Sequence, residues 1–184
     1  MNFGPKFNAQ IDIHRNFLLM NANKSLFHIL LLILAFTTSL FAQSKEAAQE
    51  EAQIETLNQF MNAWHLAAAE ANAEDFFGSM REDAIYIGTD KTERWLRDDL
   101  RKWSAKAFER ESAWKFVASE RNWQIHLDQQ FAICDELLNT WMGPCRSTAV
   151  LTWEKDGWKI IHYQLSVTID NEKIESFKAL QEVP

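Results

Sequence analysis

Residues 145–169, CRSTAVLTWEKDGWKIIHYQLSVTI, decide the fold of this protein. They hold two apolar runs on either side of Asp156-Gly157, and Asp-Gly between such runs is a strong signal for a β-hairpin. We therefore predict two antiparallel strands joined by a tight turn. Two further strands are predicted upstream, at residues 114–127 and 131–138. The second half of the chain is thus expected to form an antiparallel sheet.

The residues before this sheet have helical periodicity. Apolar positions recur every three or four residues over 54–71, which predicts an amphipathic helix. A short helix is predicted at 73–78, a short strand at 84–88, and another helix after residues 90–93, whose spacing is that of a capping box. A last helix is predicted within the C-terminal segment 172–184. Helices that precede antiparallel strands indicate one α+β domain, with the helices packed on a bent sheet.

The start of the chain has the parts of a secretory signal peptide. A single Lys24 precedes the most apolar run, at residues 26–36, and the chain turns polar after Ala42. We interpret residues 20–42 as the signal and residues 1–19 as a non-native extension. The alternative is an uncleaved anchor, but the apolar run falls short of the roughly 18–20 residues needed to span a membrane. The mature protein is expected in the periplasm or secreted, without a stable membrane anchor.

The composition excludes several function classes. The formal net charge is -7 and no basic cluster is present, which argues against nucleic-acid binding. Residues 43–53 form a polar helical lead-in. The chain has no glycine-rich phosphate loop, no metal-binding pair of histidines or cysteines, and no serine nucleophile motif, so neither a metal nor a cofactor is expected. Eight tryptophans and thirteen phenylalanines supply enough apolar area for a substantial core.

Several short segments, in the right order, resemble a SnoaL-like domain of the nuclear transport factor 2-like superfamily. They are FMNAWHLAAA (60–69), AIYIGTD (84–90), ERW (93–95), DELL (135–138), GPCRS (143–147), WKI (158–160) and YQLS (163–166). The resemblance covers residues 54–171. It implies a cone, in which a bent antiparallel sheet wraps a long helix and leaves an apolar cavity. The superfamily includes ketosteroid isomerase, ligand carriers and association modules, so the fold alone does not settle the function.

Three residues are candidates for acid–base chemistry. His65 lies at the edge of the apolar helix stripe, where it could face a cavity or be an ordinary core histidine. Asp135 and Glu136 are neighbours on a strand and must point to opposite faces. An inward Asp135 could be a base, whereas pairing with Arg146 across the turn would make it part of a structural ion pair. Tyr163 is expected to face the interior, either as a hydrogen-bond donor or as a satisfied core residue.

Aromatic residues are expected to form the walls of the pocket. Tyr86, Trp95, Trp103 and Phe108 fall where the first strand and third helix would meet the rim of the cone, and Arg146 is counted with these ligand contacts. Aromatics at helical spacing are otherwise core residues. The outer sheet face, which carries His162, Gln164 and Ser166, is predicted to be a homodimer interface. Cys134 and Cys145 flank one turn, and the sequence leaves open whether they are bonded or reduced.

Two functions are consistent with these residues. The first is a domain that binds a small apolar or aromatic molecule without turnover. The second is an isomerase, cyclase or dehydratase that uses His65 or Asp135 as base and Tyr163 as donor. We favour binding, because the sequence provides no convincing catalytic pair.

Overall fold

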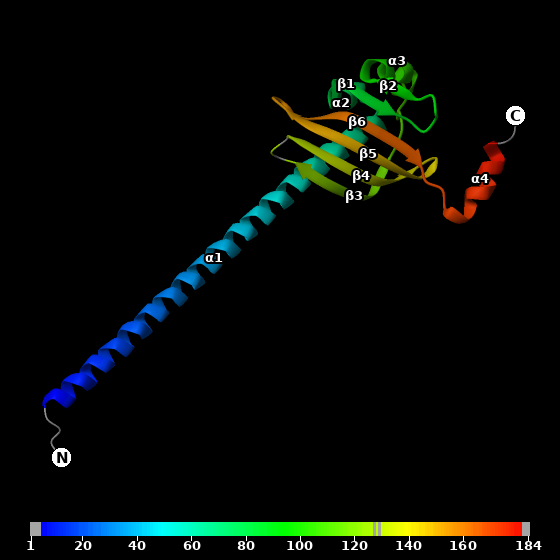
Figure 1. The fold of residues 1–184 in the computed structure, drawn as a ribbon. Coiled ribbons are helices and arrows are strands. Elements are labelled where there is room, and N and C mark those ends of the chain that lie inside the picture. The colour runs from blue at the N-terminus through cyan, green and yellow to red at the C-terminus, as the bar shows by residue number, and fades with distance from the viewer. Residues whose placement is uncertain (1–4, 127, 129, 182–184) are drawn as a thin grey trace. The chain divides into compact units, whose positions relative to one another are not determined.

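The computed structural model describes the backbone of residues 5–126, 128 and 130–181, with side chains from residue 34 onward except 35, 38 and 39 (Figure 1). The chain divides into two compact units, Met1–Gln53 and Ile54–Pro184. In the first unit the described residues belong to helix α1, Pro5–Ala69. The predicted extension, signal peptide and polar lead-in all fall in this unit, and their roles stay predictions. Among the residues described, no helix is long and apolar enough to cross a membrane.

The second unit begins with the end of α1 and contains the sheet. Its further elements are α2 (Ala73–Gly78), β1 (Met80–Ile87), β2 (Arg94–Leu96), α3 (Arg97–Phe108), β3 (Val117–His126), β4 (Phe131–Thr140), β5 (Gly143–Glu154), β6 (Gly157–Val167), η2 (Asn171–Lys173) and α4 (Ile174–Gln181). Helices therefore precede the main run of strands, as the sequence predicts. The α+β fold class is confirmed.

The six strands form one sheet in the order β2-β1-β6-β5-β4-β3. Strands β3 to β6 follow one another as an antiparallel meander. Strand β1 lies beside β6 and runs parallel to it, with Tyr86 opposite Tyr163. The sheet is therefore mixed, whereas the sequence analysis predicted only antiparallel pairs. The apolar pattern of a single strand specifies its buried face but does not specify its neighbour or their relative direction.

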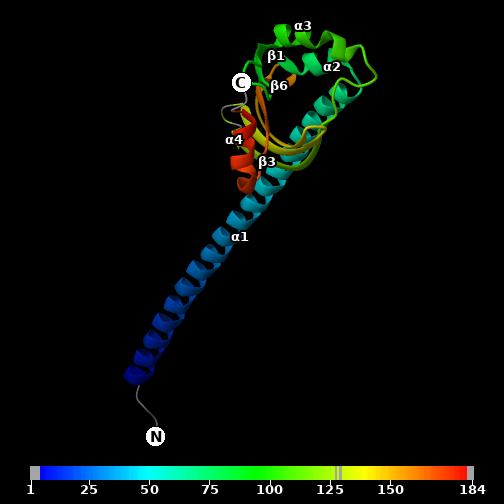
Figure 2. The same cartoon turned by 90° about the vertical axis from the view of Figure 1, so that its right-hand side faces the viewer.

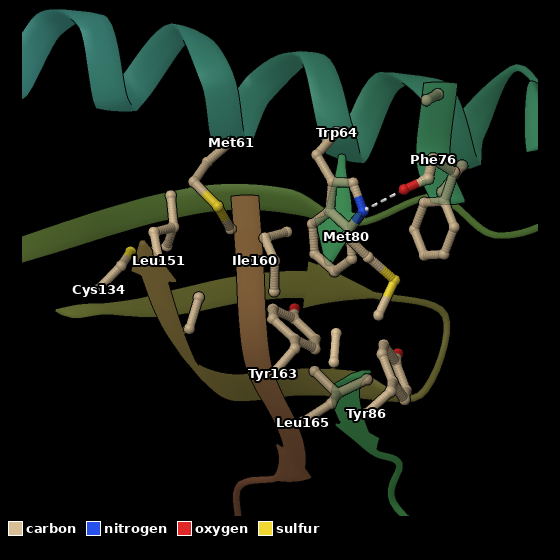
Figure 3. Close-up of a cluster of buried hydrophobic side chains, with 14 of the residues drawn as sticks. Met61, Trp64, Phe76, Met80, Tyr86, Cys134, Leu151, Ile160, Tyr163 and Leu165 are labelled. Carbon is tan, nitrogen blue, oxygen red and sulfur yellow. Dashed lines mark hydrogen bonds between the residues drawn. The ribbon is translucent and has the colours of Figure 1, made fainter. Parts of the chain in front are cut away.

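The sheet curves around the last turns of α1 (Figure 2), and the buried side chains of the two form the hydrophobic core. Met61 and Trp64 point from the helix toward Leu151, Ile160 and Tyr163 of the sheet, and all five are almost fully buried (Figure 3). The ring of Trp64 packs edge-on against Tyr163 at 4.6 Å between centroids, and its indole nitrogen donates a hydrogen bond to a backbone carbonyl of α2. The amphipathic stripe predicted for 54–71 is therefore the helix face that covers the sheet.

The predicted capping box has one of its two expected hydrogen bonds, from the backbone nitrogen of Asp90 to the Glu93 side chain, and it does not begin a helix. The backbone nitrogen of Thr92 donates to Asp90 Oδ1 at 2.8 Å, and that of Asp90 donates to Glu93 Oε2 at 3.2 Å. These contacts close the turn between β1 and β2. Helix α3 begins later, at Arg97, and its N-cap Leu96 has no capping side chain. The same local side-chain pattern can serve a turn or a helix start.

An irregularity in the last hairpin reverses which residues face the core. Val150 pairs with His162, but the next residue, Leu151, pairs with Ile160. Ile161 is thus the extra residue of a bulge. Even-numbered residues before it and odd-numbered residues after it therefore face the core. Ile160 is buried in place of Ile161, whereas Tyr163 is inward as expected. A strict alternation read from the sequence cannot detect this change.

Candidate functional site

A small aromatic pocket opens beside β1, β2 and α3. Its volume is about 150 Å³. Six aromatic side chains line it together with a carboxylate, a thioether and smaller groups: Tyr86, Trp95, Trp103, Trp114, Phe116, Trp141, Glu93, Met142, Gly88, Thr89, Leu100 and Leu165. A cavity of about this volume can hold a group the size of benzene. The pocket is therefore suited to a small molecule or to one end of a larger one.

Strand pairing and ring stacking fix the walls of this pocket. The β1–β2 register sets Tyr86 opposite Trp95, so both rings project from the same face of the sheet. Trp95 stacks on Trp103 of α3 with centroids 5.4 Å apart, and Tyr86 stacks on Tyr163 at 5.2 Å. The walls are therefore held by neighbouring rings and need not be ordered by a ligand.

Three lining tryptophans also border a second, more open hollow of about 790 Å³. They are Trp103, Trp114 and Trp141, and Lys106 and Arg110 line the same hollow. Trp141 lies in the turn between β4 and β5 with 82% of its surface exposed. An indole ring left this exposed gains little for stability, so its place at a pocket mouth favours a role in contact with a ligand.

The structure brings together three of the predicted ligand contacts and separates the other two. Tyr86, Trp95 and Trp103 line the aromatic pocket. Phe108 does not; it packs in the core at 5.3–5.4 Å from three other rings. Arg146 is also outside the pocket, because it lies on the outer sheet face. The expectation that Phe108 and Arg146 contact a ligand there is corrected by their positions.

Sequence reasoning missed Glu93, Trp114, Phe116 and Trp141 as members of the pocket. Trp141 lies in the connection between the strand predicted at 131–138 and the apolar run that begins at Cys145, and a large ring in such a connection is a signal for a surface contact. Trp114 and Phe116 lie in the segment between α3 and β3. This segment is tied to α1 by the backbone nitrogen of Ala113, which donates to a carbonyl of the helix at 3.1 Å. A hydrogen bond between segments so far apart in the sequence has no local sequence pattern, so the positions of Trp114 and Phe116 could not be predicted.

A separate polar cluster lies buried between α1, β3 and β4. Glu136 is fully buried, and its carboxylate lies 3.0 Å from His65 Nε2 and 2.7 Å from an Arg121 nitrogen. Ser147 donates a further hydrogen bond to it. Asp135 points the opposite way, to the outer face, where it pairs with Arg146 at 3.1 Å. Of the two alternatives for Asp135, the structure has the ion pair with Arg146 and not the inward base, because the β4 register turns Glu136 inward instead.

This cluster joins the helix to the sheet. Arg121 also donates to the backbone oxygen of Asn58 on α1, and Trp123 donates to the Asn58 side chain at 2.8 Å. Burial alone would raise the pKa of Glu136, but the hydrogen bonds and charges of His65 and Arg121 outweigh it and hold this pKa below its ordinary value. A carboxylate stabilised in its charged form is a weak base. The arrangement is that of a structural ion-pair network.

The proposed catalytic residues are not gathered around the pocket. Tyr163 is fully buried, and its hydroxyl oxygen has no hydrogen-bond partner within 3.5 Å in the described part of the chain. Burial raises the pKa of this hydroxyl well above its ordinary value, although Ser147 is near enough to lower it slightly. Tyr86 covers Tyr163, and the ring of Phe116 lies 6.4 Å from that of His65. The pocket wall thus stands between a ligand and both groups.

The acid limb of stability should depend on Glu136. Its pKa is lower in the folded protein, so the stabilisation is present above the unfolded pKa of about 4.3 and is lost as the pH falls through the folded value. We expect Glu136→Gln to be clearly destabilised at pH 7 and closer to the parent at pH 3. Urea unfolding at both pH values measures this. A difference that does not change with pH would contradict the assignment.

The two remaining expectations concern the cysteines and the outer face. Cys134 and Cys145 are both buried and free. The register sets Cys134 opposite Ala149 and Cys145 opposite Leu138, so the thiols are not cross-strand partners. On the outer face, His162 is paired with Val150, and the predicted homodimer contact there stays a prediction.

The sequence matches the SnoaL-like domain family over residues 57–170, and the chain belongs to this family. This match covers the sheet, α2, α3 and the end of α1, and so includes the aromatic pocket and the polar cluster. A comparison with curated protein sequences found no match. The family assignment therefore comes from the domain profile and from the fold.

Solved structures with the same fold are similar to this chain at low sequence identity. A nuclear transport factor 2-like protein of unknown function from Pseudomonas putida KT2440 has a TM-score of 0.54 at 12% identity, covering 67% of this chain and 92% of that one. One from Cytophaga hutchinsonii has a TM-score of 0.53 at 13% identity, covering 63% and 98%. A proposed ketosteroid isomerase from Parabacteroides distasonis has a TM-score of 0.50 at 20% identity, covering 62% and 86%. These likenesses support the fold.

Proposed function

We propose that this protein is an exported binding protein for a small molecule with an apolar or aromatic part, and that it does not transform this ligand. The observation that carries the proposal is the preformed pocket of about 150 Å³ with six aromatic side chains in its lining. Rings such as Trp95 and Trp103 already stack on each other, so a ligand would lose little binding free energy in ordering them. The signal-like residues 20–42 support the exported part of this proposal.

An enzymatic role has less support. An isomerase or dehydratase needs a titratable group within hydrogen-bond reach of the reacting atom. His65 is engaged by Glu136, and neither His65 nor Tyr163 contributes to the pocket lining. The carboxylate in the lining, Glu93, belongs to the turn before β2 and is not paired with a second acid or base by any ion pair among the described residues. Binding is therefore the function that this geometry favours.

Binding should depend on the exposed tryptophan of α3. We expect Trp103→Leu to weaken binding of a neutral aromatic probe, indole, about twofold to twelvefold, because ring stacking contributes roughly 0.5–1.5 kcal/mol beyond burial. Isothermal titration calorimetry of the purified mature protein measures the affinity. Trp153→Leu is the matched control, since Trp153 is similarly exposed but packs on Trp158 outside this pocket. Equal affinities in the two variants would argue against the pocket as the binding site.

Native mass spectrometry of protein purified from its own host addresses the ligand directly. A bound small molecule that disappears in Trp103→Leu and persists in Trp153→Leu would support the proposal and provide a mass for the ligand. The same spectra report the number of subunits and so test the predicted homodimer.

A further inference from the structure

The aromatic pocket has an acidic wall. Glu93 lies in its lining, and Glu93 Oε2 accepts a hydrogen bond from the backbone nitrogen of Asp90 at 3.2 Å. The side chain extends across Gly88, and a Cβ at Gly88 would collide with its carboxylate. Gly88 and Glu93 are also joined by a backbone hydrogen bond of 2.9 Å. The carboxylate is therefore held in the pocket wall by the turn itself.

No basic side chain of the described residues neutralises this carboxylate. Its ring neighbours carry no charge, and the pocket lining contains no lysine, arginine or histidine. None of the ion pairs among the described residues includes Glu93. The nearby basic residues Lys106 and Arg110 line the outer hollow, where the Arg110 guanidinium donates to the carbonyl of Ala113 at 2.8 Å. The negative charge of Glu93 acts inside the pocket, where burial and then Glu93 raise the pKa of Tyr86.

Aromatic rings and an unpaired carboxylate favour the same kind of ligand. The face of an aromatic ring is electron-rich and attracts a cation that lies within about 6 Å of its centroid. A neutral ligand would cover the carboxylate without replacing its hydrogen bonds to water, which is unfavourable. An anion would be repelled. A cation satisfies both the rings and Glu93.

The size of the pocket further limits which cations can bind in it. Drug-sized ligands need about 300–1,000 Å³, whereas this pocket has about 150 Å³. A quaternary ammonium group presents methyl groups to the ring faces and spreads its charge over them, and it has no N–H group that would need a hydrogen-bond acceptor. A primary ammonium would need several acceptors in place of its water. The lining has six aromatic rings and few hydrogen-bond acceptors, so it favours a methylated ammonium over a primary one.

We infer that the pocket binds a quaternary or otherwise methylated ammonium group, held against the faces of Tyr86, Trp95 and Trp114 with Glu93 as the countercharge. This inference rests on the proposed binding function and adds the chemical class of the ligand. The remainder of such a ligand would extend past Trp141 into the outer hollow.

Two probes that differ only in charge test this inference. Choline and 3,3-dimethyl-1-butanol have the same shape, but a neutral carbon replaces the ammonium nitrogen in the second. We expect choline to bind at least about tenfold more tightly, as measured by calorimetry at low ionic strength. Glu93→Gln should remove most of this preference, because choline loses its countercharge, whereas the glutamine oxygen can still accept from the backbone nitrogen of Asp90 and hold the turn. Glu120→Gln, on an exposed position of β3, controls for net charge.

The outcomes separate this inference from the proposed function. Equal affinity for the two probes, or a preference for choline that survives in Glu93→Gln, would overturn the cation assignment. If indole then still binds and binds more weakly to Trp103→Leu, the pocket remains a binding site for neutral aromatic groups. If indole and both probes fail to bind, the proposed function fails as well.

Discussion

Replacing Arg121 with leucine is expected to lower the free energy of unfolding by about 3–5 kcal/mol. Arg121 supplies two hydrogen bonds to Glu136, at 2.7 and 2.9 Å, and another to the backbone of α1. The substitution leaves the Glu136 carboxylate fully buried with its main countercharge removed. Urea unfolding followed by tryptophan fluorescence gives the change, since tryptophans lie on both α1 and the sheet.

Two further variants show whether the cost comes from the uncompensated charge. The double variant Arg121→Leu/Glu136→Leu should recover much of the lost stability, because replacing both partners of a buried ion pair with apolar groups is often nearly neutral. Arg146→Leu removes the partner of Asp135, the neighbouring acid on the outer face, and should cost at most about 1 kcal/mol. A similar loss in Arg121→Leu and Arg146→Leu would contradict the assignment of the inner cluster as the structural one.

Trp64→Ala should destabilise the domain by about 3–5 kcal/mol. The Trp64 ring is 2% exposed, stacks on Phe76 at 4.8 Å and meets Tyr163 edge-on. Its indole nitrogen also donates to the carbonyl of Phe76 at 3.1 Å, which ties α1 to α2. The alanine variant therefore loses core packing and leaves a buried carbonyl without its donor. Thermal and urea unfolding, followed by circular dichroism because a fluorophore is removed, measure the loss.

The matched tryptophan is Trp103, which is 56% exposed at the pocket. Trp103→Ala should cost less than about 1 kcal/mol of stability, because surface substitutions usually have small effects, while weakening ligand binding. Trp64→Ala should instead lower the free energy of unfolding more than it changes ligand affinity. If Trp103→Ala unfolds the domain as readily as Trp64→Ala, the pocket wall is part of the core and a preformed binding site is excluded.

The sequence predicts those elements whose apolar residues repeat regularly because one face of the helix or strand is buried. The helix stripe with Met61 and Trp64 and the hairpin at Asp156-Gly157 could both be predicted, because each depends on neighbouring residues. The parallel neighbour of β1 could not, since strand pairing is settled by tertiary packing. The turn at Asp90 also has part of the hydrogen-bond pattern of a helix start, and only the observed backbone distinguishes the two. The bulge at Ile161 was not predictable either, because it makes Ile160 the buried residue and the apolar pattern gives no sign of the extra residue.

The candidate site could be predicted in part. Tyr86, Trp95 and Trp103 lie on regular elements, so their places at the rim followed from the predicted strand and helix. Glu93 and Trp141 come from turns, where side-chain direction depends on the backbone of one loop. The choice between Asp135 and Glu136 depends on strand parity, which a shift of one residue reverses. Adjacent acids on a strand predict that one enters the core, but not which.

During translation, strand β1 is synthesised long before β6, the strand that it pairs with in the centre of the sheet. Strand β6, Gly157–Val167, is the last strand to be synthesised, yet it lies between β1 and β5 in the finished sheet. Pairing across such a long stretch of chain is slow to form, because the intervening loop must first be closed. A nascent chain that stops before β6 would therefore hold two disconnected fragments, and folding of the whole domain waits until translation is nearly finished.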